Sequence, residues 1–313
     1  ENTARLVDVT LRIALLPERY DRGKKEAAPW RRALDALGAA DVVRNRYGRI
    51  DAESVQRHLL LAADNPSSVY SCLHAARECA RAQRVAITAE MYEDLNVSWL
   101  EMRGQTWSRL HADGVNNMLE RVKGRSASFR GGTIGTLGRG EGYHFLQLGA
   151  FVERAEWAIR LLDIAGSEGD DTETREQAAV DYFRWSALLQ SLSAFETYRR
   201  LYRGAVNAAG VVDLMLLQAG NPRSLLTCAT TAHNVLQTLS GDDSLEVVRQ
   251  AGALSAHCRY ARIDEILQQG LEPWLQAAMA RLDRLGNAIH RQFMVSTDVA
   301  TPVMAARPWS HEQ

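Results

Sequence analysis

One line of charged side chains stands out in an otherwise apolar segment at residues 142–166, which reads GYHFLQLGAFVERAEWAIRLLDIAG. Three, four and three positions separate the members of this line: Glu153, Glu156, Arg160 and Asp163. On an α-helix such spacing places all four on one stripe, where an acid four residues before a base forms a favourable pair. Glutamate and arginine together can bind a carboxylate or phosphate through the guanidinium fork, or transfer a proton. The stripe, with Arg154 beside it in sequence, is therefore the first candidate site.

The same pattern opens the chain, 155 positions earlier: ENTARLVDV at the start answers EWAIRLLDI at 156–164. Residues 60–68 and 33–39 also have counterparts, at spacings of 156 and 155. Ordered matches at one spacing indicate an internal duplication, so we expect two homologous helical halves. By the same duplication, a segment like Tyr143–Ala155 is expected to precede residue 1. The charged positions that correspond are Glu1 with Glu156, Arg5 with Arg160, and Asp8 with Asp163.

These charged stripes have two interpretations. They are the solvated sides of buried helices, or they face each other between the halves, where buried charges must be paired. In the second case Arg154 and Arg160 would hold a carboxylate or phosphate, and Glu153 and Glu156 would orient them or hold an amine. Proton transfer would make Glu153, Arg154 and Glu156 the catalytic set. The first-half stripe, with Glu1 and Arg5, would complete the cleft as part of the substrate-binding set.

Two weaker clusters could also bind an anion. Arg77 and Arg81 lie one turn apart on a predicted helix, and Glu90 comes after them in the sequence. Arg199 belongs to a second run of acidic and basic residues. Solvated pairs of this kind contribute only a few tenths of a kcal/mol each. They are either such surface pairs or secondary substrate-binding residues.

Several other patterns predict no chemistry. The glycine-rich stretch 131–142 lacks the GK[ST] ending of a phosphate-binding loop and reads as a linker. Glu141 and His144 have the spacing of a di-iron helix, but such a site needs a second copy. Asn65 and Asn221, each followed by proline, are predicted helix caps. We therefore expect the chain to hold no metal or cofactor of its own.

The composition of the chain limits its possible fold class, binding partners and cellular location. The chain has 313 residues with only seven prolines, and its Ala-, Leu-, Arg- and Glu-rich tracts predict an all-α helical bundle. A formal net charge of −1 argues against general nucleic-acid binding. No apolar run reaches the roughly 20 residues needed to span a bilayer, so no membrane association is expected. Cys72 and Cys79 fall on the apolar side of a predicted helix and are expected to be buried free thiols, which favours a cytoplasmic protein.

The duplication also predicts how the chain is organised. Repeat 1 is expected at 1–123, with its N-terminal part apparently missing, and repeat 2 at 142–295. A Gly-rich linker at 124–141 would join them, and a loosely ordered tail would follow at 296–313. The two repeats are expected to form one compact unit.

These features together resemble one family. The motifs are GEGYHFLQLG at 140–149 with ERAE at 153–156, ENTARL at 1–6, NPSS at 65–68, AARE at 75–78, TAEMYE at 88–93 and SAFE at 193–196. In these motifs the chain resembles the alpha-E proteins, an all-helical family with a Glu-Arg motif. It departs from the family pattern at Ala150, where arginine is expected after Leu-Gly. A second Glu-Arg pair expected just before Glu1 is not in this chain.

The resemblance implies a function by association. Alpha-E proteins look like companions of circularly permuted ATP-grasp proteins and of transglutaminase-like proteins. ATP-grasp chemistry activates a carboxylate as an acyl phosphate that an amine then attacks. The chain would thus serve a peptide- or amide-bond-forming system, with ATP and Mg²⁺ supplied through the ATP-grasp partner and a peptide or amino acid as substrate. The alternative is a non-catalytic helical adaptor for either partner.

Overall fold

The computed structural model describes residues 1–16, 28–166 and 175–295, and all regular structure within these ranges is helical. The prediction of an all-α fold is confirmed. The first part of the chain forms α1 (Asn2–Ala14), α3 (Ala28–Asp35), α4 (Ala40–Tyr47), α5 (Ala52–Leu60), α6 (Val69–Ala82), the 3₁₀ turn η1 (Arg84–Ala86), α7 (Ala89–Arg103), α8 (Trp107–Asp113) and α9 (Val115–Gly135). The second part forms α10 (Glu141–Gly166), α11 (Arg175–Ser191), α12 (Phe195–Leu201), α13 (Ala208–Leu216), α14 (Leu225–Ser240), α15 (Glu246–Arg259), α16 (Ile263–Gln269) and α17 (Leu271–Phe293).

Helix boundaries recur along the chain at a spacing of 156 positions. The helices α5 and α13 have equal lengths and begin at residues 52 and 208, and α8 and α16 begin at 107 and 263. Their caps recur as well, because Asp51, Asn207, Ser68 and Ser224 each accept the backbone N–H three residues ahead. Side chains of these types are the preferred N-caps. An internal duplication predicts this pattern, and the division of the chain into two repeats stays a prediction.

The two repeated asparagines, Asn65 and Asn221, are not helix caps as the sequence predicted. The caps of α6 and α14 are the serines three residues later. Each asparagine instead fixes the loop before that serine. Its side-chain amide donates to a carbonyl seven residues earlier, at 3.1 Å to His58 and 3.0 Å to Leu214. Their recurrence therefore has a structural explanation in the loop.

The apolar spacing from Pro29 to Val42 and that at 176–203 each predict one continuous helix, but both segments are broken in the middle. One divides into α3 and α4, with Gly38 between them at a φ of 63°. The other, predicted at 176–203, divides into α11 and α12, with Ser193 at a φ of 56°. A helix end leaves carbonyl groups without intrahelical partners. The breaks therefore expose acceptors at the ends of α3 and α11, and arginines from elsewhere in the chain reach them.

The glycine-rich stretch predicted as a linker at 124–141 is mostly helical. Because α9 extends to Gly135 and α10 begins at Glu141, only residues 136–140 connect them. Tertiary packing overrides the low helix propensity of glycine here. A Cβ on Gly132 would lie 3.2 Å from Cγ of Met91 on α7, so a bare backbone at this point permits the two helices to approach closely.

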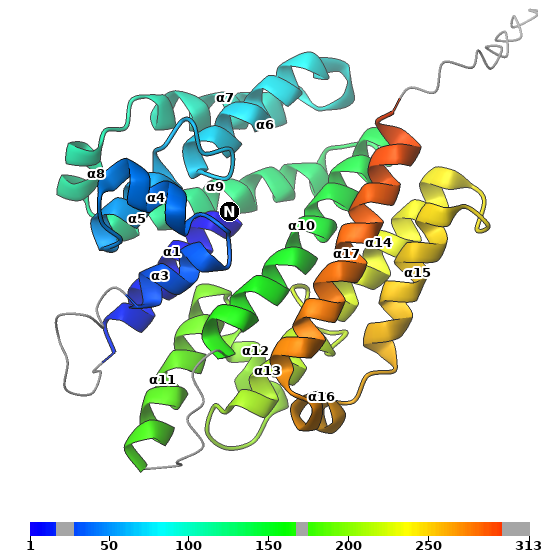
Figure 1. Ribbon diagram of the computed structural model, residues 1–313. Helices are drawn as coiled ribbons and strands as arrows, with labels where there is room; N and C mark the ends of the chain where they lie inside the picture. The colour runs from blue at the N-terminus through cyan, green and yellow to red at the C-terminus, as the bar shows by residue number, and fades with distance from the viewer. Residues whose placement is uncertain (17–27, 167–174, 296–313) are drawn as a thin grey trace, which may run out of the picture.

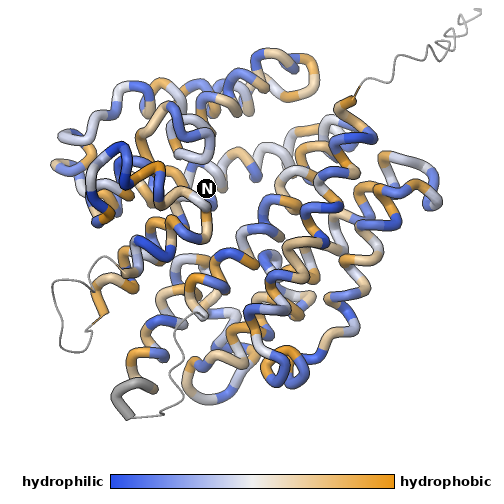
Figure 2. The backbone as a smooth tube through the Cα atoms, viewed as in Figure 1, coloured by the Kyte–Doolittle hydropathy of each residue, from blue (hydrophilic) through white to orange (hydrophobic). Residues whose placement is uncertain are grey.

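Four helices of the second part, α10, α14, α15 and α17, pack side by side (Figure 1). In the first part α6 pairs with α7, and α7 lies on α9. The link between the parts is α1, which packs on α11, α9 and α10. Hydrophilic and hydrophobic residues alternate along most helices in Figure 2, as expected when each helix buries one face. Buried residues of both parts belong to one hydrophobic core, including Leu6, Leu34, Leu162 and Leu188.

One predicted apolar face is not buried. Cys72, Ala76 and Cys79 on α6 are exposed, whereas Cys228 and Cys258 are buried, and all four thiols are free. The helical periodicity of these residues was predicted correctly, and their burial was wrong. The physical reason is that none of the described helices covers this side of α6.

Among the described residues, no helix combines the length and apolarity that crossing a bilayer requires. The predicted tail at 296–313 lies outside the described residues, as does the loop at 167–174.

Candidate functional site

The two Glu–Arg pairs that recur in the sequence occupy equivalent places in the structure. Nε of Arg5 donates to Glu1 at 2.9 Å, and Nε of Arg160 donates to Glu156 at 2.9 Å. Each arginine also reaches into the other part of the molecule. Arg5 donates to the carbonyl of Ser191 at the end of α11, and Arg160 donates to the carbonyl of Ala36 just after α3.

The breaks after α3 and α11 explain why arginine is needed at both places. Helix-end carbonyls carry a partial negative charge and need a donor. A guanidinium group can satisfy such a carbonyl and a carboxylate together, because it carries several N–H donors. The acceptors Ala36 and Ser191 are also 155 positions apart, like the arginines. The contacts that recur, Arg5 with Ser191 and Arg160 with Ala36, thus form a crosswise contact that holds the two parts of the chain together.

Around Glu1 the arrangement gains two further arginines. Arg130 of α9 pairs with its Oε2, and Arg223, in the loop before α14, pairs with its Oε1. Burial by itself would raise the pKa of Glu1, but Arg223, Arg5 and Arg130 outweigh it and lower the pKa from 4.5 to about 2. Glu1 is therefore firmly ionised, and it holds three guanidinium groups together.

The equivalent place around Glu156 has no such addition. At a spacing of 156, Arg130 corresponds to Gly286, and Arg223 corresponds to Ser67. The recurring pair alone is enough to join the parts at Glu156. The extra arginines at Glu1 are therefore not required by the architecture, which makes this place the candidate site.

Arg154 completes the positive cluster. It is half-buried on α10, and among the described residues it forms no hydrogen bond or ion pair. Its guanidinium carbon lies 5.0 Å from the ring centroid of Phe151. Burial lowers its pKa and Arg130 lowers it further, while the charge of Glu1 opposes this. Arg154 is thus a desolvated cation beside other cations, with its N–H donors free.

We call this set the Glu1 cluster: Glu1, Arg5, Arg130, Arg154 and Arg223. Three of its four guanidinium groups pair with the one carboxylate and Arg154 does not, which leaves an excess of positive charge. Burial lowers the pKa of Arg223 to about 10, with Arg5 and Arg154 adding to the effect against the attraction of Glu1. An incoming carboxylate or phosphate would relieve this crowding and could accept paired hydrogen bonds from a guanidinium fork.

Comparison with known proteins identifies the family. Residues 1–294 match Alpha-E, described as a predicted alpha-helical domain with a conserved ER motif. The chain belongs to the Alpha-E family. Similar curated proteins include an uncharacterized protein of Mycobacterium bovis and one of Mycobacterium tuberculosis. Each is 25% identical over 334 residues, which cover 98% of this chain and 35% of the relative. The chain therefore spans about a third of the length of these relatives, and no solved structure matches it.

The Glu-Arg dipeptide of α10 in this Alpha-E chain, Glu153–Arg154, lies at the junction of the two parts. Oε1 of Glu153 accepts a hydrogen bond from the side chain of Asn2 at 2.9 Å. Arg154 belongs to the Glu1 cluster, while Glu156 and Arg160 form the separate crosswise contact. The predicted site residues of the stripe are thus divided between two places.

The other predicted binding residues lie apart from the Glu1 cluster. Arg77 donates to Asn96 and Glu78, and Arg81 pairs with Glu78. Glu90 is exposed in the first turn of α7, and Arg199 is exposed on α12. Among the described residues, no hydrogen bond or ion pair connects these four to the cluster. Their surroundings are those of surface ion pairs and exposed side chains.

Sequence reasoning missed Arg130 and Arg223. Arg130 lies in the segment that the sequence predicts as a linker, and Arg223 follows the predicted cap Asn221 and its proline. One signal was available: both are arginines where the other half has a small residue, Gly286 or Ser67. Differences between the halves, rather than their similarities, indicate these residues.

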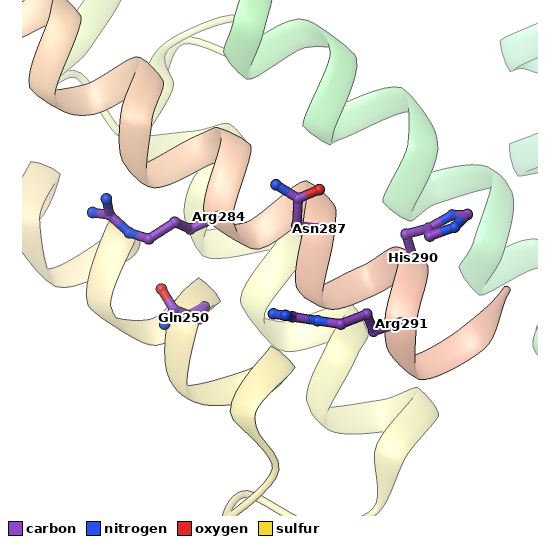
Figure 3. Close-up of a pocket in the computed structure, with 5 residues that line it drawn as sticks. All are labelled: Gln250, Arg284, Asn287, His290 and Arg291. Carbon is purple, nitrogen blue, oxygen red and sulfur yellow. The ribbon is translucent and has the colours of Figure 1, made fainter. Parts of the chain in front are cut away.

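A second basic surface lies on the second part of the chain. A pocket of about 320 Å³ between α15 and α17 is lined by Gln250, Arg284, Asn287, His290 and Arg291. Figure 3 shows the side chains of Arg284 and Arg291 extending from α17 on the side where Gln250 lies, while His290 points the opposite way. This pocket has no carboxylate in its lining. The described residues also contain no His, Cys, Asp and Glu group arranged to hold a metal ion.

Proposed function

We propose that the Glu1 cluster of this Alpha-E chain binds a carboxylate or phosphate group of a peptide or amino-acid substrate. The chain would do so within a system that forms peptide or amide bonds. The observation that carries the proposal is Arg154, a half-buried guanidinium beside three other arginines that finds no hydrogen-bond partner among the described residues. Buried cations need a compensating anion, and the single carboxylate present is already shared by the other three.

Four members of the cluster have a direct role in this proposal. Arg154 contacts the bound anion, and Arg130 and Arg223 flank it. Glu1 keeps the flanking arginines in place by accepting their hydrogen bonds. Glu153 is exposed next to the cluster and could hold the amine of the same substrate or of a second one. No proton transfer by the chain itself is needed for this role.

The chemical step would belong to a partner. The resemblance to proteins associated with ATP-grasp enzymes supports a circularly permuted ATP-grasp protein as that partner, with ATP and Mg²⁺ bound there. In such a reaction the substrate carboxylate attacks the γ-phosphate of ATP and releases ADP. An amine then displaces phosphate from the acyl phosphate to form the amide. The Alpha-E chain would present the anionic substrate to this chemistry.

Co-purification with an ATP-grasp protein, followed by mass analysis of peptides incubated with ATP and amino acids, tests the proposal. The expected product is a peptide heavier by one residue. Arg154→Ala should abolish its formation and change the unfolding free energy by no more than about 1 kcal/mol, because Arg154 makes no hydrogen bond with any residue that the structure describes. Arg199→Ala, at an exposed arginine of α12, is the matched control and should leave product formation intact. Product formation by the Arg154 variant at the normal rate would reject the proposal.

The adaptor alternative is supported by the pocket on α15 and α17. Arg284 and Arg291 form no ion pair among the described residues, and they could dock an acidic surface of an ATP-grasp or transglutaminase-like protein. The halves differ here too, because Ser128 and Gly135 stand at the corresponding positions. Under this alternative, Arg284→Glu with Arg291→Glu would abolish complex formation, and Arg154→Ala would not affect product formation.

A further inference from the structure

One face of α6 combines apolar character with exposure. Cys72, Ala76 and Cys79 are spaced four and three residues apart, so they lie on a single face, and all three are exposed. Cysteine and alanine are among the residue types that are most often buried. From Cys72 to Cys79 the face extends over seven helical steps, or about 10 Å along the helix axis.

The second half contains the same face in a covered state. The corresponding residues of α14, Cys228, Ala232 and Val235, are 0%, 2% and 9% exposed. The helix that covers them is α10, which packs along α14 in the opposite direction (Figure 1). Arg154 lies near Cys228 at the start of α14, so the residues of α10 before Arg154 run along the rest of α14.

The helix α1 meets the start of α6 as α10 meets the start of α14, but the chain begins at Glu1, the N-cap of α1. Glu1 corresponds to Glu156 of α10, and the first turn of α1 lies against the start of α6, where Thr3 Oγ1 donates to the carbonyl of Ser67 at 2.8 Å. In α10 the helix continues for fifteen residues on the N-terminal side of Glu156. A similar continuation of α1 would run directly over Cys72, Ala76 and Cys79.

We propose that this face of α6 is the docking site of a helical segment that continues α1 on the N-terminal side of Glu1. The segment needs about two to three turns to cover the face. It presents an apolar stripe to α6, as α10 does to α14 with Leu148, Val152 and Ala155. Its last turn also lies beside the Glu1 cluster, so it forms one wall of the candidate site.

Thiol accessibility tests this docking directly. Two forms of the protein are compared: residues 1–313, and the same chain with its natural upstream residues. Each is alkylated with iodoacetamide in the native state, and labelling of each cysteine is followed by peptide mass analysis. Cys72 and Cys79 should be labelled at least tenfold more slowly in the longer form. Cys228 and Cys258, buried in this structure, are internal controls that should be protected in both forms.

A substitution on the same face distinguishes docking on α6 from a general increase in the stability of the fold. Ala76→Glu should lower the melting temperature of the longer form, which buries the new charge, and should barely change that of residues 1–313. Equal labelling of Cys72 and Cys79 in the two forms would overturn the proposal. Protection that appears in residues 1–313 only as protein concentration rises would overturn it too, because the occupant would then be a second copy of the chain.

Discussion

The buried carboxylate of Glu1 should be much more important for stability than its counterpart Glu156. The perturbation is Glu1→Met, which keeps the side-chain length and removes the charge, with Glu156→Met as the matched change. The Glu1 side chain is 11% exposed and accepts from three arginines, whereas that of Glu156 is 39% exposed and pairs with one. Removing one partner from a buried charged group leaves the others uncompensated.

The pKa of Glu1 gives the magnitude. Lowering the pKa from 4.5 to about 2 corresponds to about 3 kcal/mol of stability at neutral pH, since each tenfold change in acidity is worth about 1.4 kcal/mol. Glu1→Met should therefore cost about 3 kcal/mol at pH 7. Glu156→Met should cost about 1 kcal/mol or less, as expected of a partly exposed pair.

The pH dependence follows from the direction of the change. A carboxyl with a lowered pKa in the folded state contributes its stability above pH 4.5 and loses it as the pH falls toward 2. Urea unfolding of the parent chain and of both variants, measured at several values between pH 7 and pH 2.5, provides the assay. The difference between the parent and Glu1→Met should shrink by most of its value over this range. Equal losses for the two variants at pH 7, or a Glu1 effect independent of pH, would refute the reasoning.

Three other substitutions have predictable effects on stability. Asp163 is half-buried, and burial and Glu272 raise its pKa above 3.8 against the effect of Arg160, so Asp163→Asn should raise the melting temperature at pH 7 and have no such effect below about pH 4. Gly131→Ala should stabilise α9 by about 0.5–1 kcal/mol because nothing lies near the new Cβ, as urea unfolding would show. Gly132→Ala should instead destabilise, because the new Cβ lies 3.2 Å from the buried Met91; equal effects of the two changes would contradict this packing.

Much of the fold could be predicted from the sequence because its signals are local. Helical periodicity and low proline content predicted the all-α class. The charged stripe also indicated the residues that join the parts, since Arg5 and Arg160 do reach across to Ser191 and Ala36. Which acceptors they reach depends on the helix breaks. The break at Ser193 has no glycine or proline to mark it, so periodicity alone predicted a continuous helix there.

The candidate site was less predictable because it is assembled from distant segments. The site combines Glu1 at the start of α1, Arg130 of α9 and Arg223 in the loop before α14. No spacing in the sequence relates these three residues. Burial of Cys72 was predicted from the face on which it lies, but burial also requires a neighbouring helix. Periodicity specifies the face and gives no information about what covers it.

The central claim is that the excess positive charge of the Glu1 cluster binds an anion through Arg154. Isothermal titration of the protein with a glutamate-containing tripeptide, and with the same tripeptide fully amidated, tests it most directly. We predict that the parent chain and the Arg199→Ala variant bind the acidic tripeptide and show no binding of the amidated tripeptide. Arg154→Ala should weaken binding by about 10- to 100-fold, the value of a charge-assisted hydrogen bond of 1.5–3 kcal/mol. Equal affinity of the parent chain and Arg154→Ala for the acidic tripeptide would contradict the account.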